Sequence, residues 1–101
     1  IMIKLKLEPV PYRYHETVFI YWEYELEDLL TLCFFPFPTL STYLSESIGK
    51  ETGASKEINV VCEDRRIKIW LPVNHFSDDL FKRIDEVLKE NIRILLEEVM
   101  F

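Results

Sequence analysis

The chain of 101 residues is long enough for one modest hydrophobic core and too short for two, so we expect a single domain over residues 1–101. A hydrophobic content of 49% with 30% charged residues excludes a disordered chain, and two Gly and five Pro exclude a low-complexity one. The net charge of −6 opposes non-specific attraction to nucleic acid and to anionic membranes.

The N-terminal part alternates between apolar and polar residues, which is the pattern of half-buried strands. Residues 2–8 alternate strictly, and we expect Pro9 and Pro11 to end this strand because proline cannot donate to a ladder. A second strand is predicted over residues 17–26 and a third from about residue 30 to residue 35.

The second predicted strand presents two different faces. Its even-numbered residues, Val18 to Leu26, are apolar, and an odd-numbered loop places them on the same face as Leu30, Leu32 and Phe34. The opposite face carries Phe19, Tyr21, Glu23 and Glu25. Ten of the fourteen aromatic residues lie between positions 12 and 43, which is more ring surface than one face of one hairpin can bury, so we expect something to cover them.

A short helix is predicted from residue 40 to residue 48, with Thr39 as its cap and Gly49 as the left-handed residue that ends it. A second hairpin follows within residues 58–73. Pairing Cys62 with Ile67 places the apolar residues of both strands on one face and sets an acidic residue opposite a basic one.

The final helix is predicted from Asp78 almost to residue 101, with Ser77 as its cap. Its apolar residues cover about half of the circumference, against the roughly 100° needed to pack on one surface. We therefore infer a second contact surface on this helix and expect a homodimer. The predicted interface residues are Asn91, Ile92 and Leu96.

Asn91 falls inside the apolar stripe of this helix. A buried Asn that meets its symmetry mate fixes the register of a helix pair. The alternative is an Asn side chain that bonds to a nearby backbone group within the monomer. Both interpretations stay open at this point.

No residue pattern indicates catalysis, a cofactor or a metal. His15 and His75 belong to no metal-binding spacing, Gly49 and Gly53 form no phosphate-binding loop, and no serine lies in a Gly-x-Ser-x-Gly elbow. We therefore expect no enzyme, no catalytic residue, no metal site and no cofactor.

One cluster combines basic and aromatic residues, in the hairpin around residues 63–70. Its members are Arg65, Arg66, Lys68 and Trp70. On an exposed hairpin they can follow phosphates and stack one base. Three cations are a weak footprint in an acidic chain, and charged residues on a strand also prevent edge-to-edge aggregation. Nucleic-acid binding is therefore the alternative function.

Cys33 and Cys62 lie inside apolar strand patterns without Cys-x-x-Cys spacing, which indicates two small buried hydrophobic residues. The chain contains no Gln and three Asn, and the avoidance of thermolabile amides is typical of hyperthermophiles. Because intracellular disulfides occur in such organisms, a Cys33–Cys62 disulfide remains an alternative.

The absent Gln, strands such as TVFIYWEYEL and LLTLCFFPFP, and the charged closing helix KRIDEVLKENIRILLEEVM resemble small orphan proteins of viruses that infect hyperthermophilic archaea, particularly filamentous ones. The resemblance is one of style over the whole chain and transfers no functional residue. It implies a non-enzymatic interaction protein. Characterised proteins of that group include inhibitors of host functions, nucleic-acid binders and virion components.

The fold that we expect is α+β: a mainly antiparallel sheet of about five strands, with the long C-terminal helix packed on one face and one short helix at an end or edge. The expected function is a protein-interaction module that pairs with itself and with a host or viral protein. No run approaches the roughly 18 apolar residues of a membrane helix and no signal sequence begins the chain, so we expect an intracellular protein, in the host cytoplasm if viral, without a membrane partner.

Overall fold

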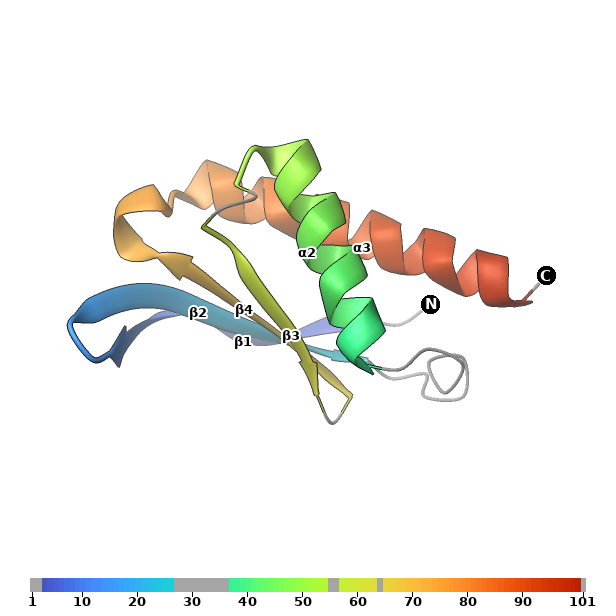
Figure 1. The fold of residues 1–101 in the computed structure, drawn as a ribbon, viewed down its shortest axis with the longest axis horizontal. Coiled ribbons are helices and arrows are strands. Elements are labelled where there is room, and N and C mark those ends of the chain that lie inside the picture. The colour runs from blue at the N-terminus through green and yellow to red at the C-terminus, as the bar shows by residue number, and fades with distance from the viewer. Residues whose placement is uncertain (1–2, 27–36, 55–56, 64, 101) are drawn as a thin grey trace.

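The computed structural model describes residues 3–26, 37–54, 57–63 and 65–100. Its elements, in chain order, are β1 (Ile3–Tyr14), β2 (Thr17–Leu26), α2 (Phe37–Thr52), β3 (Asn59–Glu63), β4 (Arg66–Pro72), a 3-10 turn (Val73–His75) and α3 (Asp78–Met100) (Figure 1). The α+β class is confirmed, with the long C-terminal helix over the sheet. The strand predicted at about residues 30–35 lies outside the described residues, as does Cys33.

Within the described residues the sheet has four strands in the order β1-β2-β4-β3, and every neighbouring pair is antiparallel. The predicted register of the second hairpin is confirmed, because Cys62 pairs with Ile67 and Glu63 with Arg66. Alternation of apolar residues was sufficient there, since a slip by one residue would turn the apolar side chains to the wrong face.

The predicted end of the first strand is wrong, because β1 continues through Pro9 and Pro11 and pairs with β2 up to a tight turn at His15. Among the described strands β1 lies at the edge of the sheet. Proline is tolerated in an edge strand, because one side of the strand has no ladder hydrogen bonds to lose. The register of pairing shifts between Leu7 and Val10, and Pro9 lies in this irregular stretch.

The predicted helix over residues 40–48 is confirmed in position but is longer at both ends. It begins at Phe37, so Thr39 lies inside it and the predicted cap is wrong, and it continues through Gly49. The left-handed residue is Gly53, with φ of +78°, and its N–H donates to the carbonyl oxygen of Gly49 at 2.9 Å. Gly49 is buried beside Ile48, so packing of the helix outweighs the local cost of a glycine.

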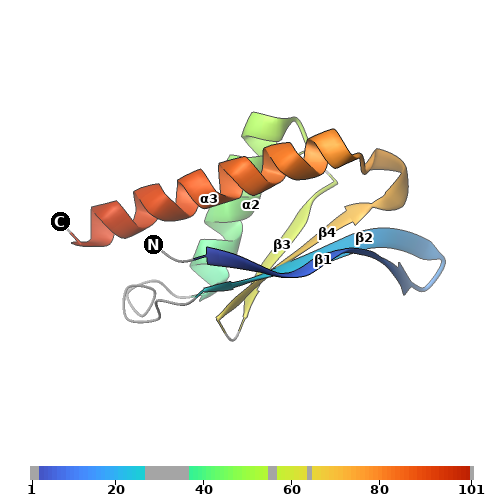
Figure 2. The ribbon, with the colours of Figure 1, turned by 180° about the vertical axis from the view of Figure 1, so that it is seen from behind.

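Both helices lie on one side of the sheet, as the opposite views of Figures 1 and 2 show. The buried side chains between the two layers form one core. Its fully buried members include Trp22, Tyr24, Leu26, Leu40, Leu44, Ile48, Ile67, Ile69, Leu71, Ile84, Leu88 and Ile92. No described helix is both long and apolar enough to span a membrane.

A buried polar chain joins the sheet to α3. Trp22 Nε1 donates to the Tyr24 hydroxyl at 3.1 Å, and that hydroxyl donates to Asp85 Oδ1 at 2.6 Å. Burial, together with the neighbouring carboxylate of Asp85, raises the pKa of Tyr24. The hydroxyl therefore stays protonated and serves as both donor and acceptor in the core.

The wide apolar stripe of α3 is used within one chain, because α3 packs against α2 as well as against the sheet. Asn91 is only 5% exposed; its Nδ2 donates to the Val87 carbonyl oxygen at 2.7 Å and its Oδ1 accepts from the Ser47 hydroxyl of α2. Ile92 is fully buried. The structure thus places two of the three residues predicted for a dimer interface in the interior of the monomer, while the side chain of Leu96 lies outside the described part.

Candidate interaction face of the sheet

The sheet has one face that no described helix covers, opposite to α2 and α3 (Figures 1 and 2). We call it the open face. Residues directly opposite each other in an antiparallel pair point to the same side, so the strand registers identify its members. Ile20, paired with Leu71, faces the core, and therefore Phe19 and Tyr21 belong to the open face.

Aromatic rings fill one half of the open face. Tyr21 lies between Trp70 of β4, with ring centroids 4.8 Å apart, and Tyr12 of β1, at 5.9 Å. Tyr12 is also paired with Phe19 across the β1–β2 ladder. We call this region the aromatic half, and it comprises Tyr12, Tyr14, Phe19, Tyr21 and Trp70.

A shallow hollow of about 360 Å³ is formed on the aromatic half. Its lining consists of Tyr12, Tyr14, Phe19, Asn59, Val61 and Trp70. Tyr14 is 59% exposed and Tyr12 45%, although both are large apolar rings. Contiguous exposed apolar surface of this kind marks interaction sites in soluble proteins.

Charged side chains fill the other half of the open face, and we call it the charged half. Three cross-strand ion pairs join Lys6 to Glu25 at 3.6 Å, Arg66 to Glu23 at 3.2 Å and Lys68 to Glu63 at 3.7 Å. Each pair joins one cation to one anion. The charged half is therefore nearly neutral, although the whole chain carries −6.

No family model, curated protein or solved structure matches this chain. The resemblance to archaeal viral proteins stays a prediction. The role of the open face therefore has to follow from its own geometry and chemistry.

The structure brings together most of the residues predicted for nucleic-acid contact. Arg66, Lys68 and Trp70 project from β4 onto the open face, while Arg65 lies in the β3–β4 turn with a φ of +69°. The geometry differs from the sequence expectation in one respect: Arg66 and Lys68 are engaged by carboxylates. Trp70 contacts Tyr21, so the dominant feature of the face is aromatic rather than basic.

Sequence reasoning counted Tyr12 and Tyr14 among the clustered rings but placed neither in a strand, because it ended the first strand at Pro9 and Pro11. The signal that identifies them is the period of two at Val10, Tyr12 and Tyr14, which continues the strand pattern through Pro11.

Each described edge of the sheet carries a feature that disfavours the addition of a further strand. The outward N–H of Cys62 on β3 donates to the Ser41 hydroxyl of α2 at 2.7 Å, and β1 carries Pro9 and Pro11. Both features disfavour pairing with another strand at these positions. Burial raises the pKa of the Cys62 thiol to about 11, which keeps it neutral and unreactive.

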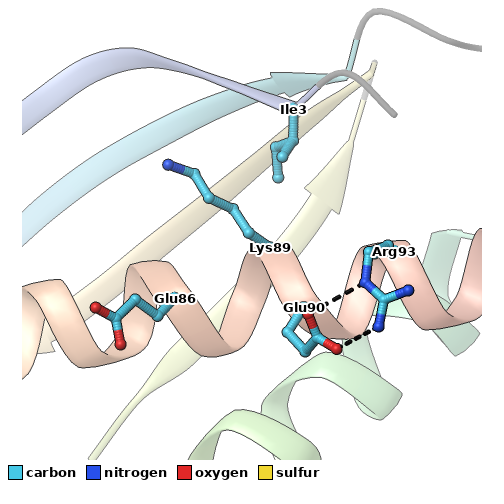
Figure 3. A pocket seen from close by; sticks show the side chains of 5 residues that line it. All are labelled: Ile3, Glu86, Lys89, Glu90 and Arg93. Atoms are coloured by element: carbon cyan, nitrogen blue, oxygen red, sulfur yellow. Dashed lines mark hydrogen bonds and ion pairs between the residues drawn. The ribbon is translucent and has the colours of Figure 1, made fainter.

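A second hollow, of about 660 Å³, lies between the start of β1 and the outer side of α3 (Figure 3). Its lining consists of Ile3, Glu86, Lys89, Glu90 and Arg93. Lys89 pairs with Asp85, and Arg93 bonds to Glu90, which raises the pKa of the guanidinium and lowers that of the carboxyl. These cations are already neutralised, so the hollow offers a ligand no concentrated charge.

Metal-ligating side chains do not gather in the described part of the chain, where no group of three His, Cys, Asp or Glu could hold an ion. His15 lies in the β1–β2 turn with its ring 4.3 Å from that of Tyr14, and His75 lies in the 3-10 turn. Both histidines are exposed.

Proposed function

We propose that the protein is a non-enzymatic interaction module that binds another protein chain through the open face of its sheet. The uncovered aromatic half carries this proposal. Tyr and Trp are the residues most enriched at the energetic centres of protein interfaces, because they bury a large area with little loss of side-chain entropy. The hydrogen bond at Cys62 and the prolines of β1, which disfavour strand addition at the described edges, support binding by the face.

The charged half suits the rim of such an interface. Its ion pairs are exposed to water, so they contribute little to the stability of the monomer. In a complex, the same groups select partners and orient them by charge complementarity.

Two observations support a role other than catalysis. The hollow on the aromatic half is lined by rings, one Asn and one Val, without a nucleophile beside a base. The raised pKa values of Tyr24 and Cys62 keep these buried groups protonated and inside the core.

The test compares three immobilised proteins: wild type, the double variant Tyr12→Ser/Trp70→Ala, and Tyr43→Ser as a matched control. Tyr43 is an exposed ring on α2, away from the open face. Each is incubated with lysate of a hyperthermophilic archaeon and, separately, with a second, differently tagged copy. We expect the double variant to retain at least about 10-fold less partner than wild type and Tyr43→Ser to match wild type.

Fluorescence of the remaining Trp22 confirms that the double variant is folded, because this indole is fully buried in the native core. Equal capture by wild type and a folded double variant would contradict the proposal.

A second candidate function is binding of single-stranded nucleic acid. The row of rings from Tyr12 through Tyr21 to Trp70 can stack bases, each worth about 1–3 kcal/mol, and Arg66 and Lys68 lie on the same face. This function requires both cations to leave their carboxylates.

The two functions differ in their response to salt. Contact with about three cations predicts a slope of log affinity against log salt of roughly −2 to −3, and Arg66→Ala should make it shallower by nearly one unit. Trp70→Ala should weaken binding further. We expect no micromolar binding to DNA or RNA at about 150 mM salt, and such binding, weakened by both substitutions, would favour the second candidate.

A further inference from the structure

The charged half of the open face carries one sign of charge per strand. The basic residues are Lys4 and Lys6 of β1 and Arg66 and Lys68 of β4, and the acidic residues are Glu23 and Glu25 of β2 and Glu63 of β3. Glu8 of β1 is the exception to this pattern, because it is exposed at the same period of two as Lys4 and Lys6; it lies in the irregular stretch next to the aromatic half. In the strand order β1-β2-β4-β3 the signs therefore alternate: plus, minus, plus, minus.

We propose that a second copy of the chain packs on the open face, with a two-fold axis along the strands between β2 and β4. This proposal rests on the proposed function and names its partner. Rotation about that axis reverses the order of the strands. Each residue of the partner stays at the same height along the strand direction. It places β1 over the partner's β3 and β2 over the partner's β4, so that each strand of one sign meets a strand of the other.

The same rotation lays the aromatic half of one copy on the aromatic half of the other. Tyr21 of β2 then lies over β4 of the partner, the strand that carries Trp70. A two-fold axis across the strands would instead lay rings on charged side chains, at a cost in desolvation. Sheets packed face to face keep their strands within about 30° of each other and lie about 10 Å apart, which these side chains can fill.

The size of the face agrees with this partner. The four strands contain 12, 10, 7 and 5 residues. With about 3.3 Å per residue and about 4.8 Å between strands, they cover roughly 500 Å². This footprint is about two thirds of the roughly 800 Å² of accessible surface that each partner contributes to a stable interface. The aromatic half alone provides about half of this footprint, so the charged half has to take part.

The alternation of charge also separates a second copy from nucleic acid. A phosphate backbone carries one sign only and requires a continuous positive surface. Here every basic strand has an acidic neighbour, so the face attracts its own rotated pattern more than a polyanion.

Exchange of charges between two variants tests the geometry. The first variant, Glu23→Lys/Glu25→Lys, makes β2 basic, and the second, Arg66→Glu/Lys68→Glu, makes β4 acidic. In a dimer of either variant alone, β2 and the partner's β4 carry charges of the same sign and repel each other. A mixture of the two restores opposite signs at both β2–β4 contacts.

Light scattering and sedimentation measure the result. We expect wild type to have twice the chain mass of 12.2 kDa at micromolar concentration, each variant alone to dissociate at least about 100-fold more readily, and the equimolar mixture to regain the dimer. Of the four replaced side chains, that of Glu23 is 13% exposed and the others are 28–44% exposed. We expect both variants to stay folded, because ion pairs of this kind at the surface contribute little to stability. Circular dichroism checks the fold.

Three outcomes would overturn the proposal: wild type that stays monomeric at about 100 μM, variants that dimerise as wild type does, or folded variants that do not associate when mixed. A monomeric wild type that still captures a different protein through the aromatic half would leave the interaction face standing and exclude the second copy. A wild type that neither dimerises nor captures another protein would contradict the proposed function as well.

Discussion

Replacement of Tyr24 by Phe removes one oxygen atom from the junction between β2 and α3 and leaves the ring in place. That oxygen donates to Asp85 Oδ1 at 2.6 Å and accepts from Trp22 Nε1 at 3.1 Å. The residues joined in this way come from the sheet and from the helix above it. The substitution therefore tests how strongly the two layers depend on the buried polar chain.

Two costs determine the magnitude. A hydrogen bond to a charged group contributes about 1.5–3 kcal/mol, and a buried N–H left without a partner costs about 1–3 kcal/mol. Trp22 is fully buried, so water cannot replace the lost acceptor, whereas Asp85 is partly exposed and keeps Lys89 at 3.0 Å. We expect Tyr24→Phe to lower the free energy of unfolding by about 3 kcal/mol.

Urea denaturation followed by Trp fluorescence measures this change in a Trp70→Phe background, in which Trp22 is the only indole. Tyr12→Phe is the matched control, because its exposed ring should tolerate loss of the hydroxyl within about 0.5 kcal/mol. A double-mutant cycle with Asp85→Ala should give a coupling energy of about 1–2 kcal/mol.

The reasoning would be refuted if Tyr24→Phe cost no more than Tyr12→Phe. A large cost with no coupling to Asp85 would show that the Trp22 contact, and not the link to α3, stabilises the junction.

Three further predictions concern two buried side chains and one exposed turn. Asn91→Asp should destabilise the protein by about 3 kcal/mol at neutral pH, because a buried carboxylate would face the Val87 carbonyl oxygen. Unfolding curves should show that stability recovers in acid, where the new carboxyl group becomes protonated. The control Asn91→Ala should show no such recovery. The Cys62 pKa is raised from about 9 to about 11, so its contribution to stability is complete below pH 9 and is lost as pH rises toward 11. The difference in unfolding free energy between wild type and Cys62→Val should therefore fall by roughly 2 kcal/mol between about pH 8 and pH 10.5, and a constant difference would contradict it. Gly53→Ala should lower the free energy of unfolding, measured by heat or urea, by about 1 kcal/mol. The left-handed backbone is the only cause of this cost, since no atom lies within 4 Å of an added Cβ. Gly53→Asn should cost less, because Asn adopts this conformation more readily.

Local patterns were sufficient wherever neighbouring residues decide the structure. The β3–β4 hairpin was predicted with its register, because alternating apolar residues and the Glu63–Arg66 pair agree on one alignment. The start of α3 at Asp78 was predicted as well; the Ser77 side chain accepts from the N–H of Leu80 at 3.1 Å and caps it. The open face of β2 followed from the same period of two.

Tertiary position decided the features that the local patterns misjudged. Prolines such as Pro9 and Pro11 would end a strand with neighbours on both sides. Among the described strands β1 has one neighbour, and only the strand order reveals that. The sequence pattern predicts that Gly49 ends the helix, and only the burial of α2 shows why the helix continues through it. In both cases the local cost is small compared with the burial that the whole fold provides.

The residues of α3 show the same division most clearly. The sequence alone determines that its apolar stripe is too wide for one contact surface, because the stripe depends only on the 3.6-residue period of a helix. Whether the second surface meets another chain or the same chain depends on where α2 lies, and α2 comes from a distant part of the sequence. The hydrogen bond between Ser47 and Asn91 decides this for the buried part of α3. The aromatic half of the open face is assembled in the same way, from rings of β1, β2 and β4 that only the pairing of the strands brings together.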